Sequence, residues 1–326
     1  MGDGRAADLL VLGDCNPDVL VLGGDVTPEF GQQEKLVDRM DLTVGGSASI
    51  TAVAAARLGL RVALVAAVGD DPAGHFMLGR LAAEGVDVSA VAVRDSVPTG
   101  MTVALSRGED RAILTATGAM ASVTAADVPR ELLRTARHVH VSSYFLLERT
   151  LGPGLAALFA AARAAGAGTS LDTNWDPAGR WGGTALRAVL GQTSLLVPNE
   201  AEALRLARRD SLPDAVGTLT AAGTTLVVKQ GARGALCAAP GQSETVHVQL
   251  PPVRPVDTTG AGDCFNAGLI AGLLRGLPLP RAAAVGCAVA AASTQAPGGT
   301  GSPLHLDEAL SRARAATIGQ VPSGPD

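Results

Sequence analysis

Short β-rich runs alternate with Ala- and Leu-rich runs of helical character along most of this chain. The alternation predicts a mostly parallel β-sheet covered by helices on both faces. Ligands of such folds bind at the carboxyl ends of the strands. Strands are predicted at residues 9–12, 62–68, 138–142, 168–172, 194–197 and 225–228. Helices are predicted between them, at residues 48–58, 74–84, 155–165 and 200–208.

Two stretches interrupt this alternation. Residues 18–44 contain two β-rich runs without a convincing helix, and residues 98–115 have the pattern of a β-hairpin with a Gly-containing turn. We expect the two stretches to form one small β-sheet that serves as a lid over a site at the strand ends. Residues 1–17, 45–97 and 116–326 would then form a large α/β domain that binds nucleotide and substrate. The predicted fold class is a three-layer α/β/α domain with a small β-sheet lid.

The composition is that of a globular protein, with 47% hydrophobic and 17% charged residues. Lys and Arg number 26 against 31 Asp and Glu, a net charge of −5, which argues against a nucleic-acid surface. No run of about 18 uninterrupted apolar residues is present, so no membrane span is expected. The first residues lack the pattern of a secretory signal, which predicts a cytoplasmic protein. The four cysteines are far apart and predict buried thiols rather than a zinc site.

The segment from Pro255 to Gly268 is the most informative part of the chain. Its glycines permit a tight turn, and the apolar residues after the turn have helical spacing. An anion would bind the exposed amides at the start of that helix, where the helix dipole favours negative charge. Asp263 falls in the first turn, where it could accept a proton from a hydroxyl attacking phosphorus. Taken alone, Asp263 could equally be a helix-capping residue.

Two motifs of this sequence resemble those of a known family. The run Asp257-Thr-Thr-Gly-Ala-Gly-Asp-Cys-Phe265 is similar to the C-terminal motif of the ribokinase/PfkB carbohydrate kinases. The pair Gly45-Gly46, followed by the helical residues 52–59, is similar to the N-terminal motif. The resemblance implies a ribokinase-like fold and an ATP-dependent kinase that phosphorylates a hydroxyl of a small sugar or sugar acid. It also implies Mg²⁺ and a monovalent cation such as K⁺.

Site residues follow from the resemblance position by position. Asp263 would be the general base, and the amides of Gly260, Ala261 and Gly262 the anion hole. The sugar would contact Asp263, Asn16, Asp18, Gly45, Gly46 and Tyr144. The nucleotide would contact Asn199, Lys229, Gly231, Ala232, Gly234 and Cys287. Glu202 would hold Mg²⁺ through water, and a monovalent cation would bind at Asp257, Thr259 and Gly298.

The sequence also departs from the family pattern. Ile50 occupies a position where the family often has Asn, which removes one sugar contact. Asp172 and Asn174 keep part of a family strand-end motif, but Trp175 follows them. From the residues alone, Asp18 could be a turn residue and Glu202 a solvated charge.

Several alternatives therefore stay open. They are a nucleoside kinase, a non-catalytic relative that senses sugars or nucleotides, and a kinase of phosphorylated sugars. An aromatic side chain facing the lid-side pocket would favour a nucleoside, and a wholly polar pocket would favour a sugar. A phosphorylated acceptor would need cations, for which the lid offers Lys35, Arg39, Arg107 and Arg111. Lids of this family often meet across a dimer, so a homodimer is a further expectation.

Overall fold

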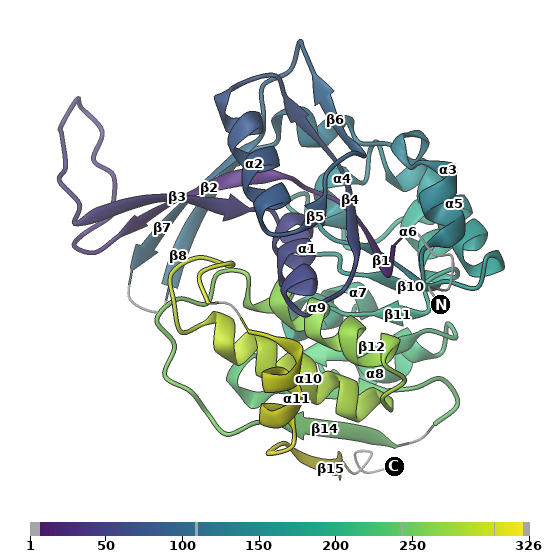
Figure 1. The fold of residues 1–326 in the computed structure, drawn as a ribbon. Coiled ribbons are helices and arrows are strands. Elements are labelled where there is room, and N and C mark those ends of the chain that lie inside the picture. Colours follow the sequence, from purple (N-terminus) through teal and green to yellow (C-terminus); the bar gives the residue numbers. More distant parts are fainter. Residues whose placement is uncertain (1–6, 108–109, 243, 303, 322–326) are drawn as a thin grey trace.

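The computed structural model describes residues 7–107, 110–242, 244–302 and 304–321. Figure 1 shows a large helix-covered body from which a small β-sheet projects to one side. The hairpin turn predicted near residues 107–110 includes positions 108 and 109, which lie outside the described residues.

The large sheet has the strand order β15-β14-β13-β12-β11-β10-β9-β1-β4-β5, and β6 pairs with β4. The strands from β12 to β5 are parallel, whereas β13, β14 and β15 form an antiparallel edge. The predicted mostly parallel sheet is therefore confirmed. Its strands are β1 (Leu9–Leu12), β4 (Val62–Gly69), β5 (Val86–Asp87), β6 (Val91–Arg94), β9 (His138–Val141), β10 (Gly168–Leu171), β11 (Leu195–Leu196), β12 (Thr225–Lys229), β13 (Ala235–Ala238), β14 (Thr245–Gln249) and β15 (Thr317–Val321).

Helices cover both faces of this sheet (Figure 1). Side chains alternate along each strand, so Leu9 and Val11 face one hydrophobic core while Leu10 and Leu12 face the other. The first core is closed by α1 (Ser47–Arg57), α2 (Pro72–Ala83), α9 (Ala261–Leu274), α10 (Leu279–Ser293) and α11 (Leu306–Ala313). The second is closed by α3 (Arg130–Thr135), α4 (Tyr144–Leu147), α5 (Gly152–Ala164), α6 (Thr184–Leu190), α7 (Glu200–Ala207) and α8 (Leu212–Thr220). Short 3₁₀ turns are η1 (Gly118–Ser122), η2 (Ala125–Asp127) and η3 (Gly231–Arg233).

The small sheet joins the two stretches that interrupt the α/β alternation. Its order is β3-β2-β7-β8, with bounds β2 (Asn16–Leu22), β3 (Arg39–Gly45), β7 (Met101–Arg107) and β8 (Asp110–Ala116). Asp18 pairs with Thr43 on the antiparallel neighbour and with Thr102 on the parallel one. The predicted combination of a large α/β unit with a separate small sheet is thus confirmed.

Two buried histidines support the centre of the large sheet. His138 and His140 both hydrogen-bond the Ser170 hydroxyl at 2.7 Å. Burial lowers the pKa of His138 to about 3 and that of His140 to about 4, so both are neutral at pH 7. Their hydrogen bonds and burial indicate a structural role.

No helix within the described ranges is long and apolar enough to cross a membrane.

Candidate active site

A cleft of about 1080 Å³ lies between the carboxyl ends of the parallel strands and the small sheet. Residues that directly follow β1, β9, β10 and β11 contribute to its walls, as does the start of α9. Most of the predicted site residues come together here. Those that line the cleft are Asn16, Asp18, Gly46, Asn199, Glu202, Lys229, Gly231, Ala232, Gly234, Thr259, Gly260, Ala261, Gly262, Asp263 and Cys287.

The turn that begins α9 requires glycine at its first position. Gly260 has a φ of 69°, and a Cβ there would lie 2.6 Å from the Cα of Gly299. The amide of Ala261 closes the turn on the Thr258 carbonyl at 3.3 Å. No side chain caps α9, and Gly260, Ala261 and Gly262 all line the cleft. The helix therefore presents its positive end to whatever occupies the cleft.

Asp263 lies in the first turn of α9 and is only 8% exposed. Burial raises the pKa of its carboxyl group well above the ordinary value, and the nearby charges of Asp172 and Asp14 act in the same direction. Lys229 and a hydrogen bond from Ser47 oppose this rise. A carboxylate with a raised pKa is better matched to accepting a proton near neutral pH than a solvated one.

Asp14 is a buried group in the cleft wall to which the sequence reasoning assigned no role. Its carboxylate accepts hydrogen bonds from the amides of Ser47 and Ala48, both at 3.0 Å, and from the Ser143 hydroxyl at 3.0 Å. Asp14 thus caps the start of α1 from the end of β1. Burial raises its pKa, and these hydrogen bonds offset part of the rise. Its position directly after the first strand was the available signal.

Asn16 and Asp18 reach the cleft from the small sheet. The Asn16 side-chain amide donates to Asp18 Oδ1 at 3.0 Å and to the Thr102 hydroxyl at 3.1 Å. Gly45 packs against this pair, because a Cβ there would lie 1.9 Å from Asp18 Oδ1. Gly45 is not among the described residues that line the cleft, and its predicted contact with the sugar stays a prediction. In the structure Gly45 supports Asp18.

Ile50 occupies the family position where Asn was expected, and its role is packing. Its side chain is 3% exposed and lies within 3.1 Å of the sites that a Cβ would occupy on Gly260 and Gly299. Ile50 therefore fills the space behind the turn at Gly260 and sets how closely α1 approaches α9.

Asn199 and Glu202 form a reciprocal capping box at the start of α7. The Asn199 amide donates to Glu202 Oε2 at 2.9 Å, and the Glu202 amide donates to Asn199 Oδ1 at 2.9 Å. Glu202 is buried, which excludes the solvated-charge reading. Burial, and then the charge of Asp172, raise the pKa of its carboxyl group to about 7.

A buried ion pair lies below the turn that begins α9. Lys229 Nζ contacts Asp172 Oδ2 at 2.5 Å, and the Asn266 side-chain amide donates to the same oxygen at 2.6 Å. Burial alone would lower the pKa of Lys229, but the charges of Asp172, Glu202 and Asp263 raise it above its usual value. In the sequence Asp172 is recognisable only as part of a strand-end motif, and Asn266 belongs to no motif. A polar residue inside the apolar run of α9 was the signal for Asn266.

Asp257 organises the loop beside the turn. Its carboxylate accepts hydrogen bonds from the amide and hydroxyl of Thr259, at 2.9 and 2.8 Å, and from the Gly298 amide at 2.8 Å. Asp257 and Gly298 do not appear in the described cleft lining, whereas Thr259 does. Of the predicted cation residues, Asp257 and Gly298 thus lie beside the cleft and Thr259 lies in its wall.

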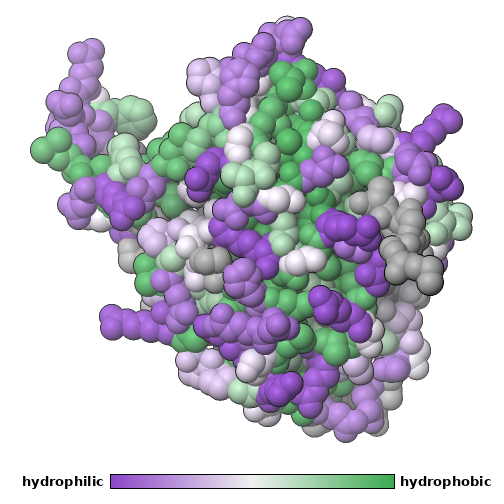
Figure 2. Space-filling model, in the orientation of Figure 1, coloured by the Kyte–Doolittle hydropathy of each residue, from purple (hydrophilic) through white to green (hydrophobic). Residues whose placement is uncertain are grey.

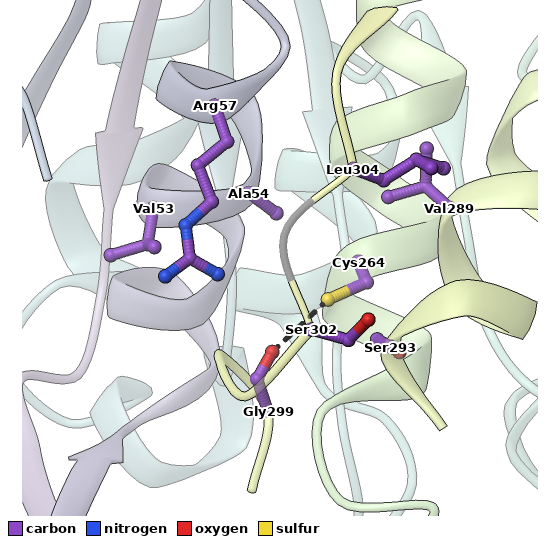
Figure 3. Close-up of a pocket in the computed structure, with 9 residues that line it drawn as sticks. All are labelled: Val53, Ala54, Arg57, Cys264, Val289, Ser293, Gly299, Ser302 and Leu304. Carbon is purple, nitrogen blue, oxygen red and sulfur yellow. Dashed lines mark hydrogen bonds between the residues drawn. The ribbon is translucent and has the colours of Figure 1, made fainter. Parts of the chain in front are cut away.

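Hydrogen bonds hold the loop after Gly298 in place around the small cavity shown in Figure 3. The Cys264 thiol donates to the Gly299 carbonyl at 3.3 Å, and Arg57 Nη1 donates to the Thr300 carbonyl at 2.6 Å. Arg57 is itself held by a bidentate pair with Glu84 at 2.7 Å. These contacts fix the backbone against which Gly260 packs.

Two aromatic residues near the strand ends differ in their exposure to the cleft. Tyr144 is fully buried, packs edge-on against Phe145 and does not appear in the described cleft lining. Its predicted contact with the sugar stays a prediction to which this burial gives no support. Trp175 lines the cleft instead, is 54% exposed and rests edge-on against Trp181 with ring centroids 4.8 Å apart. Tyr144 begins α4, which packs into the second core, while the irregular segment after β10 leaves Trp175 in the cleft.

Comparisons with known proteins agree with this architecture. The chain matches the model of the pfkB family of carbohydrate kinases over residues 6–305. The 2-dehydro-3-deoxygluconokinase of Bacillus subtilis (strain 168) is 31% identical over 274 residues, which cover 78% of this chain and 82% of that protein. The fructokinase of Salmonella typhimurium is 31% identical over 275 residues, which cover 81% of this chain and 87% of that protein.

Solved structures show the same fold. The fructokinase of Vibrio cholerae O395, in a form with fructose, ADP and calcium ion bound, matches with a TM-score of 0.79 at 24% identity. The match covers 94% of this chain and 99% of that one, and it confirms the predicted ribokinase-like fold. The predicted carbohydrate kinase reaction is also supported by these relatives. This chain belongs to the pfkB family of carbohydrate kinases.

Proposed function

We propose that this protein transfers the γ-phosphoryl group of ATP to a hydroxyl of a small sugar. The acceptor oxygen forms a bond to the γ-phosphorus, the bond from that phosphorus to the β–γ bridging oxygen breaks, and ADP leaves. Asp263 takes the hydroxyl proton, and the amides of residues 260–262 hold the charge that develops on the phosphoryl oxygens. The observation that carries this proposal is the buried Asp263 carboxylate in the first turn of α9, within the cleft.

The acceptor would lie against the small sheet. Asn16, Asp18, Ser47, Ser143 and Asn174 all line the cleft and offer hydrogen-bonding groups that suit several hydroxyls. Lys229 is the only Lys or Arg among the described residues that line the cleft. A neutral sugar therefore fits better than a sugar acid or a phosphorylated sugar, which would need further cations.

Trp175 supports a second candidate, a nucleoside kinase. Its exposed ring in the cleft wall could stack on a planar base. Release of ADP with a panel of neutral sugars, sugar acids and nucleosides tests both readings. We expect turnover to be fastest with a neutral sugar, and a nucleoside as best acceptor would establish the second candidate. No turnover with any acceptor would instead favour a non-catalytic, ligand-sensing relative.

The nucleotide would occupy the other end of the cleft, where Asn199, Gly231, Ala232, Gly234 and Cys287 form the wall. Mg²⁺ in such sites usually keeps several waters and takes one or two carboxylates plus the substrate phosphates. Glu202 fits this need, because it is a buried carboxylate in the cleft wall whose charged form a cation would favour. Bound Mg²⁺ would neutralise charge on the phosphates, and Glu202 would orient its waters.

Glu202→Gln should raise the Mg²⁺ concentration needed for half-maximal turnover more than it raises the acceptor KM. In the wild type this Mg²⁺ requirement should fall as pH rises through about 7, because the carboxyl group then loses its proton. The variant should lack that pH dependence. Mg²⁺ titrations at pH 6 and pH 8 measure it, with Glu200→Gln as a control on the same helix but outside the described cleft lining. Identical titrations for wild type and Glu202→Gln would refute the metal role.

A monovalent cation such as K⁺ is proposed at Asp257, Thr259 and Gly298. The Asp257 carboxylate already accepts hydrogen bonds from Thr259 and Gly298. Two carboxylate oxygens offer about four acceptor positions, so capacity for a cation is left. Bound there, the ion would stabilise the loop that supports Gly260. Turnover in K⁺ compared with tetramethylammonium tests this part of the proposal.

The small sheet, within residues 18–44 and 98–115, is proposed to act as a lid that carries Asp18. Asp18→Ala should weaken acceptor use by about 1.5–3 kcal/mol, the range for hydrogen bonds to charged groups. The acceptor kcat/KM measures this loss, and ADP affinity should not change because the nucleotide end of the cleft is separate. Asp41→Ala is the matched control, since Asp41 lies on β3 of the same sheet and pairs with Arg39. An unchanged kcat/KM for Asp18→Ala would refute the sugar contact.

A homodimer through the small sheet is also proposed. Its outer face carries a cross-strand row of Leu42, Val19, Val103 and Leu114, and Figure 2 shows hydrophobic side chains on this projecting sheet. Leu42 and Leu114 are 53% and 64% exposed in the single chain. A second copy would cover this apolar face. Light scattering in solution gives the mass that decides between monomer and dimer.

A further inference from the structure

We infer that Lys229 is a catalytic residue that contacts the transferring phosphoryl group, rather than one that contributes to nucleotide affinity. The inference rests on the proposed phosphoryl transfer and deepens it. Lys229 ends β12, lines the cleft and has a side chain only 13% exposed. A Cβ on Gly262 would lie 3.5 Å from Lys229 Nζ, so the ammonium group lies against the anion-hole turn.

The surroundings of Lys229 hold the ammonium group in place. Asp172 Oδ2 lies 2.5 Å from Nζ, and Asn266 Oδ1 lies 3.5 Å from it. Asn266 also donates to Asp172, which fixes the orientation of that carboxylate. An ammonium group has three N–H donors. With Asp172 and Asn266 on one side and the turn at Gly262 on the other, a donor remains for an anion at the turn.

The charges of the site require such a group. Carboxylates of Asp14, Glu202 and Asp263 line the cleft, and the phosphoryl group to be transferred is also anionic. No other Lys or Arg lines the cleft within the described residues. A positive charge already in position beside the phosphoryl oxygens stabilises the negative charge that develops on them in the transition state, and the protein need not rearrange. This stabilisation is larger in a site that excludes most water than in bulk water.

Lys229 and the loop that follows it lie at different places in the cleft, so their contributions to catalysis and to nucleotide affinity can be distinguished. Gly231, Ala232 and Gly234 line the nucleotide end of the cleft, whereas Lys229 Nζ points to Asp172 and Gly262. Removing the ammonium group should therefore slow transfer of the γ-phosphoryl group and leave the affinity for ADP, which lacks that group, nearly unchanged. A role in nucleotide affinity would predict the reverse.

The test uses Lys229→Met together with the double variant Lys229→Met/Asp172→Asn. The single variant leaves a buried carboxylate without its partner and could unfold, whereas the double variant removes both charges. We expect kcat to fall about 10²–10³-fold in both, the usual loss when one donor to the developing charge is removed. The Kd for ADP, measured by calorimetry, should stay within about threefold. Lys229→Arg should recover part of kcat, because it restores the charge.

Arg94→Met is the matched control, since it removes the cation of the Arg94–Asp127 ion pair outside the described cleft lining. It should keep wild-type kcat. A double variant with kcat within tenfold of wild type would overturn the inference. So would a Kd for ADP that weakens in step with kcat. Failure of the proposed function looks different, because then the wild type itself forms no phosphorylated product with any acceptor of the panel.

Discussion

Asp263→Asn should lower kcat by about 10²–10⁴-fold, the usual contribution of a general base. The amide keeps the size of the side chain and cannot accept the hydroxyl proton. Because the base acts in the chemical step, the affinity for ATP should stay within a few-fold of wild type. Single-turnover kinetics on the best acceptor, together with ATP binding by calorimetry, measure the two effects. More than a tenth of wild-type turnover in the variant would show that Asp263 is not the base.

The same substitution should leave the protein at least as stable as the wild type at neutral pH. The folded-state pKa of Asp263 is raised, chiefly by burial, so the folded state binds the proton more tightly than the unfolded state does. The contribution of this group to stability therefore falls as pH rises from its ordinary pKa through the raised one. Asn has no such penalty. In thermal unfolding at pH 5 and pH 8, the Tm of the variant relative to that of the wild type should be higher at pH 8 than at pH 5.

A carboxylate with the opposite shift provides the control for this stability effect. Burial alone would raise the pKa of Asp127, but hydrogen bonds from Arg94 and Thr124 lower it. Asp127 therefore stabilises the folded state above its unfolded pKa, and this stability is lost as pH falls through the lowered value. Asp127→Asn should destabilise the protein at pH 8 and keep kcat. Equal stability losses in both variants would contradict the burial argument for Asp263.

Gly260→Ala should be nearly as damaging to catalysis. Its φ of 69° costs an ordinary residue about 1–2 kcal/mol, and the new Cβ would lie 2.6 Å from Gly299 Cα and 3.0 Å from Ile50. The Gly299 contact is with a backbone atom and the Ile50 side chain is buried, so neither neighbour can move aside easily. The turn itself must therefore shift. A displaced anion hole should lower kcat about 10²–10³-fold, as loss of one such donor does. Steady-state kinetics with the best acceptor measure this loss.

Gly276→Ala is the control for Gly260→Ala, because it has the conformational cost of a positive φ without displacing the turn at Gly260. Gly276 follows the same helix with a φ of 78°, and a Cβ there would meet nothing within 4 Å. Gly276→Ala should lose a similar amount of stability and keep wild-type kcat. If the two variants were equally active, the close contact between Gly260 and Gly299 would have no catalytic importance.

The main elements of the fold could be predicted from the sequence, because they depend on short-range patterns. Six strands and four helices lie within a few residues of their predicted bounds, since apolar runs and helical spacing are local properties. Position along the chain also located the main part of the site, because residues directly after parallel strands meet at one edge of the sheet. Asn199 reaches the cleft for this reason, whereas Asn16 and Asp18 reach it from β2 of the small sheet and Asp263 from the start of α9.

The sequence by itself therefore determined the α/β fold, the family and the chemistry expected at Asp263. Only the tertiary structure decided which polar groups are buried together, since Lys229, Asp172 and Asn266 are far apart in the chain and meet through β10, β12 and α9. It also buried Tyr144 and left Trp175 in the cleft wall, because exposure depends on what the rest of the fold covers. Local spacing fixes the direction of a side chain within its own element. Its neighbours, its charge state and its access to a ligand are set by the other elements that pack around it.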